Sequence, residues 1–152
     1  MIKDSGCRTE FGSGAVRDIQ VGKGRCDLLP LDVVGYMLGL PELRFIENFK
    51  QTGDVVYLYD ALKHSCIYDD LYTMFLDVSR HFEEGAGKYG ENNWQKGIPV
   101  ECYVNSAVRH CLKYFKGETD ENHNYAFVWN VICCIWTCEH KPELNGYIKQ
   151  NA

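Results

Sequence analysis

Two adjacent glutamates, Glu83 and Glu84, are the first residues whose type and spacing could do chemistry. Adjacent carboxylates on a helix repel each other, so such a pair occurs either on a solvated surface or around a divalent cation. Hard oxygen ligands of this kind suit Mg²⁺ or Mn²⁺. The pair taken alone favours a solvated polar face and leaves a metal site as the alternative.

A second acidic group lies at residues 118–123, where three carboxylates and an imidazole occur within six positions: Glu118, Asp120, Glu121 and His123. A helix-capping segment explains one of these acids, because a capping side chain accepts from exposed N–H groups at the start of a helix. It does not explain three. The segment is therefore open to two equal interpretations, a helix cap and a metal-binding group.

A basic row follows the spacing i, i+4 and i+7 with Arg109, Lys113 and Lys116. On a helix these residues share one face, where arginine offers a planar fork and lysine a point charge to a polyphosphate. We interpret Lys116 as part of a solvated face. His110 lies at the boundary between faces and fits either the core or a site.

The segment after residue 123 is apolar on almost every side, which is typical of a central helix. Asn130 interrupts it, seven residues after His123. Buried amides need hydrogen-bond partners, so Asn130 is expected to face a polar group inside the domain. A hydrogen-bonded core asparagine is the competing interpretation.

Helices are the elements that must position these residues, and the hydrophobic spacing predicts an all-α fold. We expect short helices over 31–40 and 43–49, with Pro41 stopping the first, and another helix over 55–63. A long amphipathic helix should start near Asp69, with Pro99 opening the next helix and Gly117 ending it. The final helix is expected over 120–140. The predicted apolar face of the long helix comprises Leu71, Phe75, Val78, Phe82, Ala86 and Tyr89.

Length and composition limit the number of domains, the classes of partner and the expected location of the protein. The 152 residues predict one domain over 1–152, with a glycine-rich loop or arm over about 1–27. The formal net charge of −5 disfavours nucleic-acid binding. The sequence shows no apolar stretch of membrane-spanning length and no signal peptide at its start, so we expect a cytoplasmic protein without membrane partners, whose eight cysteines stay reduced.

Three stretches resemble a known family. They are FGSGAVRD with GKGRCDLLP (11–18 and 22–30), EEGAGKYGENNWQKGIP (83–99), and RHCLKY with GETDENHNYAFVWN (109–114 and 117–130). Together they are similar to the phage dATP/dGTP diphosphohydrolases, which are relatives of MazG within the all-α nucleoside triphosphate pyrophosphohydrolases. The resemblance covers most of the chain in order and is weakest over 31–68.

The resemblance implies a MazG-like helical bundle that hydrolyses dGTP and dATP to the deoxynucleoside monophosphate and pyrophosphate, using two or three Mg²⁺ or Mn²⁺ ions per site. It implies a phage enzyme in the host cell cytoplasm that supplies dGMP for 2-aminoadenine nucleotide synthesis. It also implies a homodimer or homotetramer whose sites lie between helices and are completed by a neighbouring subunit. The glycine-rich arm is our candidate for that cross-subunit element.

The metal motif of the superfamily is E-E-x-x-E on one helix and E-x-x-D on the next. Glu83 and Glu84 match the first pair, while Gly87 stands in the place of the third glutamate. In the second motif, Glu118-x-x-Glu121 keeps two acids, and Glu121-x-x-Asn124 better matches the position before the apolar run.

The resemblance assigns catalysis to Glu84 and Glu83, and it assigns metal binding to Glu83, Glu84, Glu118, Asp120 and Glu121. Candidate substrate ligands are Arg25, Lys88, Asn93, Trp94, Arg109, His110, Lys113, His123 and Asn130. Two other functions stay open: a catalytically inactive nucleotide-binding or regulatory module, favoured by Gly87, and a helical adaptor for protein partners.

Overall fold

The computed structural model describes residues 3–148 and confirms the all-α fold class. Its helices are α1 (Leu31–Leu38), α2 (Pro41–Thr52), α3 (Val56–Lys63), α4 (Leu71–Tyr89), α5 (Val100–Lys116) and α6 (His123–His140). Short 3₁₀ helices lie at η1 (Cys26–Leu28), η2 (Asn93–Lys96) and η3 (Pro142–Leu144). The strands β1 (Arg8–Glu10) and β2 (Val16–Asp18) pair antiparallel.

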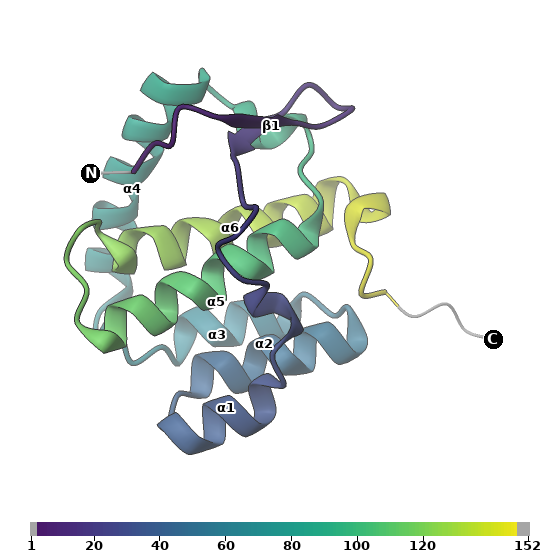
Figure 1. Ribbon diagram of the computed structural model, residues 1–152. Helices are drawn as coiled ribbons and strands as arrows, with labels where there is room; N and C mark the ends of the chain where they lie inside the picture. The colour runs from purple at the N-terminus through teal and green to yellow at the C-terminus, as the bar shows by residue number, and fades with distance from the viewer. Residues whose placement is uncertain (1–2, 149–152) are drawn as a thin grey trace.

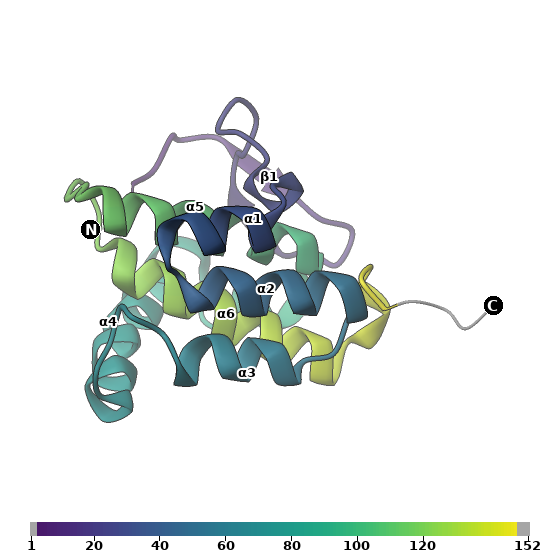
Figure 2. The same cartoon turned by 90° about the horizontal axis from the view of Figure 1, so that it is seen from below.

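Helices α5 and α6 pack along each other and form the centre of the molecule. Helices α1, α2 and α3 form a layer on one side of this pair, and α4 crosses the end of α6 (Figures 1 and 2). The β1–β2 hairpin lies on the side away from that layer, and the chain then passes over α5 to reach α1 (Figure 1). The central position of α6 confirms the interpretation of its apolar sequence.

Local chemistry explains where the helices begin and end. The Asp70 carboxylate accepts from the backbone N–H groups of Tyr72 and Thr73, which caps α4. The first residue of α1 is bound by a carboxylate from α2: Glu47 Oε1 accepts from the Leu31 N–H at 2.8 Å. The prediction that Pro41 stops the first helix needs a correction: Gly39 ends α1 in the left-handed conformation, and Pro41 opens α2.

Three further expectations differ from the structure. Residues 8–18 form a hairpin, although the sequence showed no second strand that could pair. Helix α6 begins at His123 rather than near residue 120, because the backbone of Asn122 is not helical, with φ −81° and ψ 78°. The predicted apolar face of α4 is wrong at its start, since Leu71 and Phe75 are 41% and 51% exposed, while Met74 is buried in the core.

The remaining expectations concern cysteines and membranes. All eight cysteines are free thiols, and three of them, Cys111, Cys133 and Cys134, are buried as small apolar side chains. None of the helices within residues 3–148 has both the length and the hydropathy that a membrane span requires. The single domain over 1–152 stays a prediction.

Candidate active site

A cavity of about 180 Å³ lies where α4, α5 and α6 meet beneath the β1–β2 hairpin. At about 30 Å³ for each water in the liquid, it has room for about six water molecules. Its charged lining is mainly basic and comprises Lys3, Arg17, Asp18, Lys23, Arg109, Lys113 and Glu121. His81, Tyr89, His110 and Trp129 add rings from the three helices. We call this space the basic cavity.

Strand β2 is fixed above the basic cavity by one side chain of η2. Asn93 Oδ1 accepts from Val16 N–H at 2.9 Å, and Asn93 Nδ2 donates to the Val16 carbonyl at 2.8 Å. Further along, Cys26 N–H donates to Asn105 Oδ1 on α5. The glycine-rich segment, predicted as a loop or an arm, therefore packs on helices of its own chain and builds part of this chain's own cavity.

Arg17 enters the cavity from β2 and meets only uncharged partners within residues 3–148. Its Nη2 donates to Ser106 Oγ at 2.9 Å and to Asn130 Oδ1 at 3.1 Å. Its guanidinium lies over the rings of Tyr103 and Trp129, with centroid distances of 5.2 and 5.9 Å. Its Nη1 is buried and has no hydrogen-bond partner.

Arg109 supplies a second guanidinium from α5, and its side chain is also without a carboxylate partner in the described part of the chain. Its donors go to Gln20 Oε1, to the Gly24 carbonyl and to Asn105 Oδ1, at 2.8–3.0 Å. Its Nε is buried without a partner. Burial lowers the pKa of Arg109, which reflects the cost of holding this charge out of water.

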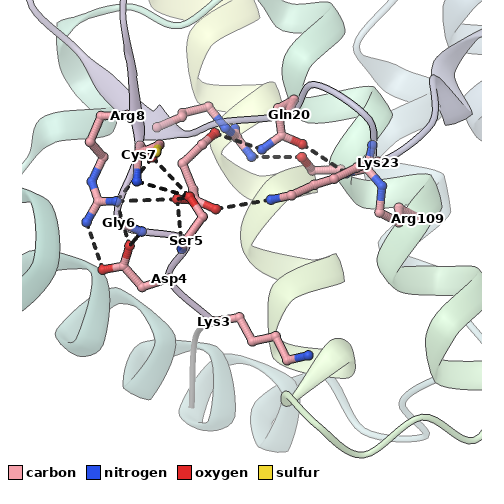
Figure 3. Close-up of polar contacts among 12 residues, drawn as sticks. Lys3, Asp4, Ser5, Gly6, Cys7, Arg8, Gln20, Lys23 and Arg109 are labelled. Carbon is pink, nitrogen blue, oxygen red and sulfur yellow. Dashed lines mark hydrogen bonds and ion pairs between the residues drawn. The ribbon is translucent and has the colours of Figure 1, made fainter.

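The one acid of β2 does not neutralise these arginines. Asp18 pairs with Lys23 at 3.1 Å and with Arg8 at 3.3 Å, and Figure 3 shows Arg8 and Lys23 on opposite sides of Ser5. Burial acts to raise the pKa of Asp18, but hydrogen bonds from Ser5 and Lys23 outweigh this effect and lower it. Asp18 is thus engaged by Arg8 and Lys23, and within residues 3–148 neither Arg17 nor Arg109 forms an ion pair with it.

Two histidines and an aspartate form a hydrogen-bonded chain beside the cavity. His110 Nδ1 lies 2.9 Å from His123 Nδ1, and His123 Nε2 lies 2.8 Å from Asp120 Oδ1. His123 is buried, whereas His110 lines the cavity. Burial and the neighbouring His123 hold the pKa of His110 well below its ordinary value.

The acids of 118–121 lie at the start of α6 in two groups that share His123. Two sets of side chains have ligand atoms within 4.8 Å of one another: Glu118, Asp120 and His123, and also His110, Glu121 and His123. Lys3 occupies this group as a cation, because its Nζ lies 2.8 Å from Asp120 and its N–H donates to Glu121. The Lys3 hydrogen bond, followed by that of His123, lowers the pKa of Asp120.

Glu83 and Glu84 belong to neither of those sets among the described residues. Glu83 is exposed and Glu84 is half-buried on the last turns of α4. The charge of Glu84 acts on the ring of His81, but burial dominates there and lowers the pKa of His81 to about 4. The two predicted acidic motifs are therefore not assembled into one cluster in this structure.

The other predicted substrate ligands divide into two groups. Lys113 and Asn130 line the basic cavity, together with Asn93. Arg25, Lys88 and Trp94 do not line it: Arg25 pairs with Asp27 at 2.7 Å, and Lys88 donates to the Lys3 carbonyl. Trp94 packs edge-on against Phe82 and Trp136.

Sequence reasoning missed several side chains of the basic cavity: Arg17, Asp18, Gln20, Lys23, His81 and Ser106. Four of these lie in the glycine-rich stretch, which has no periodicity from which a face can be deduced. The one available signal was that FGSGAVRD, which contains Arg17, formed part of the family resemblance. A residue inside such a stretch can be assigned to a site only when its contacts are known.

Comparison with known proteins gives one match. Residues 57–146 match the model of a family described as dATP/dGTP diphosphohydrolase, N-terminal. No match was found among curated proteins or among solved structures. The matched residues include α4, α5 and α6, whereas the hairpin that covers the cavity lies before them.

Proposed function

The chain belongs to the dATP/dGTP diphosphohydrolase family, a family of hydrolases acting on acid anhydrides, and from this premise we propose that it cleaves dGTP and dATP between the α and β phosphates. The products are the deoxynucleoside monophosphate and pyrophosphate. We propose dGTP as the first substrate and dATP as the second.

One observation carries this proposal, namely the two guanidinium groups in the basic cavity that have no carboxylate partner within residues 3–148. A buried cation is costly unless an anion compensates it, and Arg17 and Arg109 have only neutral acceptors. Lys113 adds a third positive charge to the same lining. A triphosphate supplies the missing negative charge, and arginine binds phosphate oxygens with a planar fork.

Carboxylates at the start of α6 fit a divalent cation. Glu118 and Asp120 offer carboxylate oxygens within 4.8 Å of each other, Glu121 lies in a second group that shares His123 with them, and the ammonium of Lys3 already takes the place of a cation beside Asp120. Glu118, Asp120 and Glu121 would hold Mg²⁺ or Mn²⁺, and the family resemblance adds Glu84 and Glu83 of α4 to these ligands. Both ring nitrogens of His123 are hydrogen-bonded, so we leave it out of this set. A bound ion neutralises phosphate charge and lowers the pKa of a bound water.

The protein's own groups account for the remaining tasks. Arg17 and Arg109 neutralise and orient the phosphates, and Asn130 and Ser106 hold Arg17 in place. Tyr89 and Trp129 line the same cavity and offer ring faces to the purine. Glu84 is the proposed carboxylate that takes a proton from water, with Glu83 beside it.

Cellular role and assembly are part of the same proposal. We place the enzyme in the cytoplasm of a phage-infected cell, where it supplies dGMP for 2-aminoadenine nucleotide synthesis, and we propose a homodimer or homotetramer. The three family-like stretches support this role. Sedimentation of the purified chain measures the assembly, and a monomer that is fully active would contradict a site completed by a neighbouring subunit.

The test is pyrophosphate release from each of the four deoxynucleoside triphosphates, with Mg²⁺, with Mn²⁺ and with a chelator. We expect metal-dependent release that is fastest with dGTP, then dATP. Binding of dGTP without release would support the inactive nucleotide-binding module instead. A chain that neither binds nor cleaves any of the four would support the adaptor.

A further inference from the structure

We propose that three amide side chains hold the two arginines of the basic cavity without neutralising them, which leaves their charge for a polyphosphate. These amides are Asn105 and Gln20 beside Arg109, and Asn130 beside Arg17. They are positioning residues, because they act on a phosphate through the guanidinium groups. The inference rests on the proposed function and deepens it, since it states how the same site obtains its affinity for a triphosphate.

Asn105 lies one helical turn before Arg109 on α5 and is buried. Its Oδ1 accepts from Arg109 Nη2 and from Cys26 N–H, in both cases at 2.8 Å. Within residues 3–148 the hydrogen bonds of this side chain use Oδ1 alone. One neutral oxygen therefore fixes both the guanidinium group and the chain segment that passes over α5.

Gln20 holds the same guanidinium from the segment that follows β2 (Figure 3). Its Oε1 accepts from Arg109 Nη1 at 3.0 Å, and its Nε2 donates to the Asp18 carbonyl at 3.0 Å. Because the NH₂ group of this amide is bound to a carbonyl, its oxygen is the atom that faces the arginine. Arg109 thus receives a second neutral acceptor.

Arg17 is held in the same way from α6. Asn130 Oδ1 accepts from Arg17 Nη2 at 3.1 Å, while Asn130 Nδ2 donates to the Ala126 carbonyl at 2.8 Å. Ser106 Oγ also accepts from Nη2, at 2.9 Å. Both N–H groups of Nη2 are therefore used, whereas Nη1 is buried without a hydrogen-bond partner within residues 3–148. The Nη1 end is the part of this guanidinium that remains for an anion.

The two acids of residues 18–27 do not neutralise these arginines. Asp18 pairs with other basic side chains, and Asp27 pairs with Arg25 at 2.7 Å. In the described part of the chain, neither Arg17 nor Arg109 forms an ion pair with either acid. The acceptors of both guanidinium groups are amide, carbonyl and hydroxyl oxygens.

The difference between an amide and a carboxylate explains what this arrangement does. An aspartate or glutamate at the three positions would have nearly the same shape and could accept the same hydrogen bonds. It would also form an ion pair, whose attraction is strong away from bulk water, so the arginine charge would be compensated before a ligand arrives. An amide oxygen orients the guanidinium without that compensation, and the empty cavity stays positively charged.

The first test measures binding of inorganic tripolyphosphate by isothermal titration calorimetry without divalent cations, so it requires no turnover. Asn105→Asp keeps the two acceptor contacts and adds a negative charge beside Arg109, so the affinity should fall about 10-fold or more. Gln20→Glu should do the same from a half-buried position. Asn48→Asp adds the same charge at an exposed position of α2, and this control should bind like the wild type.

Thermal unfolding of the empty chain separates the effect of charge from damage to the fold. Asn105→Asp and Gln20→Glu each gain an ion pair, so their melting temperatures should not fall below that of the wild type. Asn105→Leu loses both hydrogen bonds, so its melting temperature and its tripolyphosphate affinity should fall together. A merely structural role predicts that affinity follows melting temperature in every variant. If Asn105→Asp does not fold, Gln20→Glu provides the comparison.

Steady-state pyrophosphate release from dGTP with Mn²⁺ gives a second measurement of the same variants. The amides act on phosphate binding, so in Gln20→Glu and Asn105→Asp the KM should rise about 10-fold or more while kcat changes little. Asn48→Asp should match the wild type in both constants. A fall in kcat at unchanged KM would contradict a role in binding.

The outcomes distinguish this inference from the proposed function. If the wild type does not bind tripolyphosphate, the inference is wrong, even if dGTP is cleaved. If the wild type binds tripolyphosphate with the expected loss in both acidic variants but releases no pyrophosphate from dGTP, the proposed function fails and the role of the amides stands. If the wild type is active and Asn105→Asp and Gln20→Glu keep its tripolyphosphate affinity, the proposed function stands and the inference is overturned.

Discussion

At the scale of single residues, Arg17 illustrates how a charge without an acidic partner among residues 3–148 points to a ligand. Its guanidinium is held in place by Ser106, Asn130 and two aromatic rings, all of them neutral. Such a group adds little to stability because its desolvation is not compensated by a carboxylate. Its position is better explained by an anion that binds in the cavity.

Replacing Arg17 with glutamine tests this explanation. Arg17→Gln removes the charge, and a hydrogen bond to a charged group contributes about 1.5–3 kcal/mol, so dGTP binding should weaken by about 10- to 100-fold. Isothermal titration calorimetry measures the change. Arg44→Gln, which alters an exposed arginine of α2, is the control. Unchanged affinity in Arg17→Gln would place the phosphates elsewhere.

Replacing Glu84 with glutamine tests the catalytic and metal-binding role that the family resemblance assigns to this residue. Glu84→Gln keeps size and removes the charge that a divalent cation and a proton acceptor both require, so activity should fall by orders of magnitude. The melting temperature should stay close to that of the wild type. An active Glu84→Gln protein at ordinary Mn²⁺ concentration would end the assignment.

At the scale of elements, the turn between α2 and α3 depends on one glycine. Gly53 has a φ of +71°, and a Cβ there would lie 2.7 Å from the backbone N and Cα of Ile148. The segment after η3 therefore packs directly on this turn, where Asn145 Nδ2 also donates to the Gly53 carbonyl. Close backbone approach and a left-handed conformation both require glycine.

Gly53→Ala should consequently destabilise the chain more than Gly39→Ala. Gly39 has a φ of +68° but open space around its Cα, so alanine there incurs only the left-handed penalty of about 1–2 kcal/mol. At Gly53 the steric conflict with Ile148 adds to that penalty. Urea denaturation of both variants measures the difference, and equal losses would show that the contact with Ile148 is easily displaced.

At the scale of the whole molecule, we predict that binding of a divalent cation stabilises the fold. Carboxylates gathered at the start of α6 repel one another without a cation, so a bound ion should stabilise the fold by about 2.7 kcal/mol at a hundredfold excess over Kd. Melting curves with and without Mn²⁺ on the wild type, Glu118→Gln and Glu121→Gln identify the ligand. We expect Glu121 to be the ligand. This expectation is wrong if Glu121→Gln keeps the full Mn²⁺-induced shift in melting temperature while Glu118→Gln loses it.

Stability of the metal-free chain should also fall on acidification. The pKa of His81 is about 4 in the fold against 6.5 for an ordinary histidine, so the unfolded chain takes up the proton first. The contribution is complete above pH 6.5 and is lost as the pH falls toward 4, by up to about 3 kcal/mol. Urea denaturation with a chelator at pH 7 and pH 4.5 measures it. His81→Gln should reduce this loss, and a loss unchanged from wild type would contradict the assignment.

The amino-acid sequence by itself determined the helices, the central place of α6 and the family. Hydrophobic periodicity, prolines and glycines act over a few residues, so they are legible without a structure. Only the tertiary structure decided that the glycine-rich segment is a hairpin, that Arg17 lies beside Asn130, 113 positions later, and that His110 meets His123. Contacts between distant positions depend on how the helices pack against one another. A local sequence pattern therefore does not predict which buried charged side chain will lack an acidic partner.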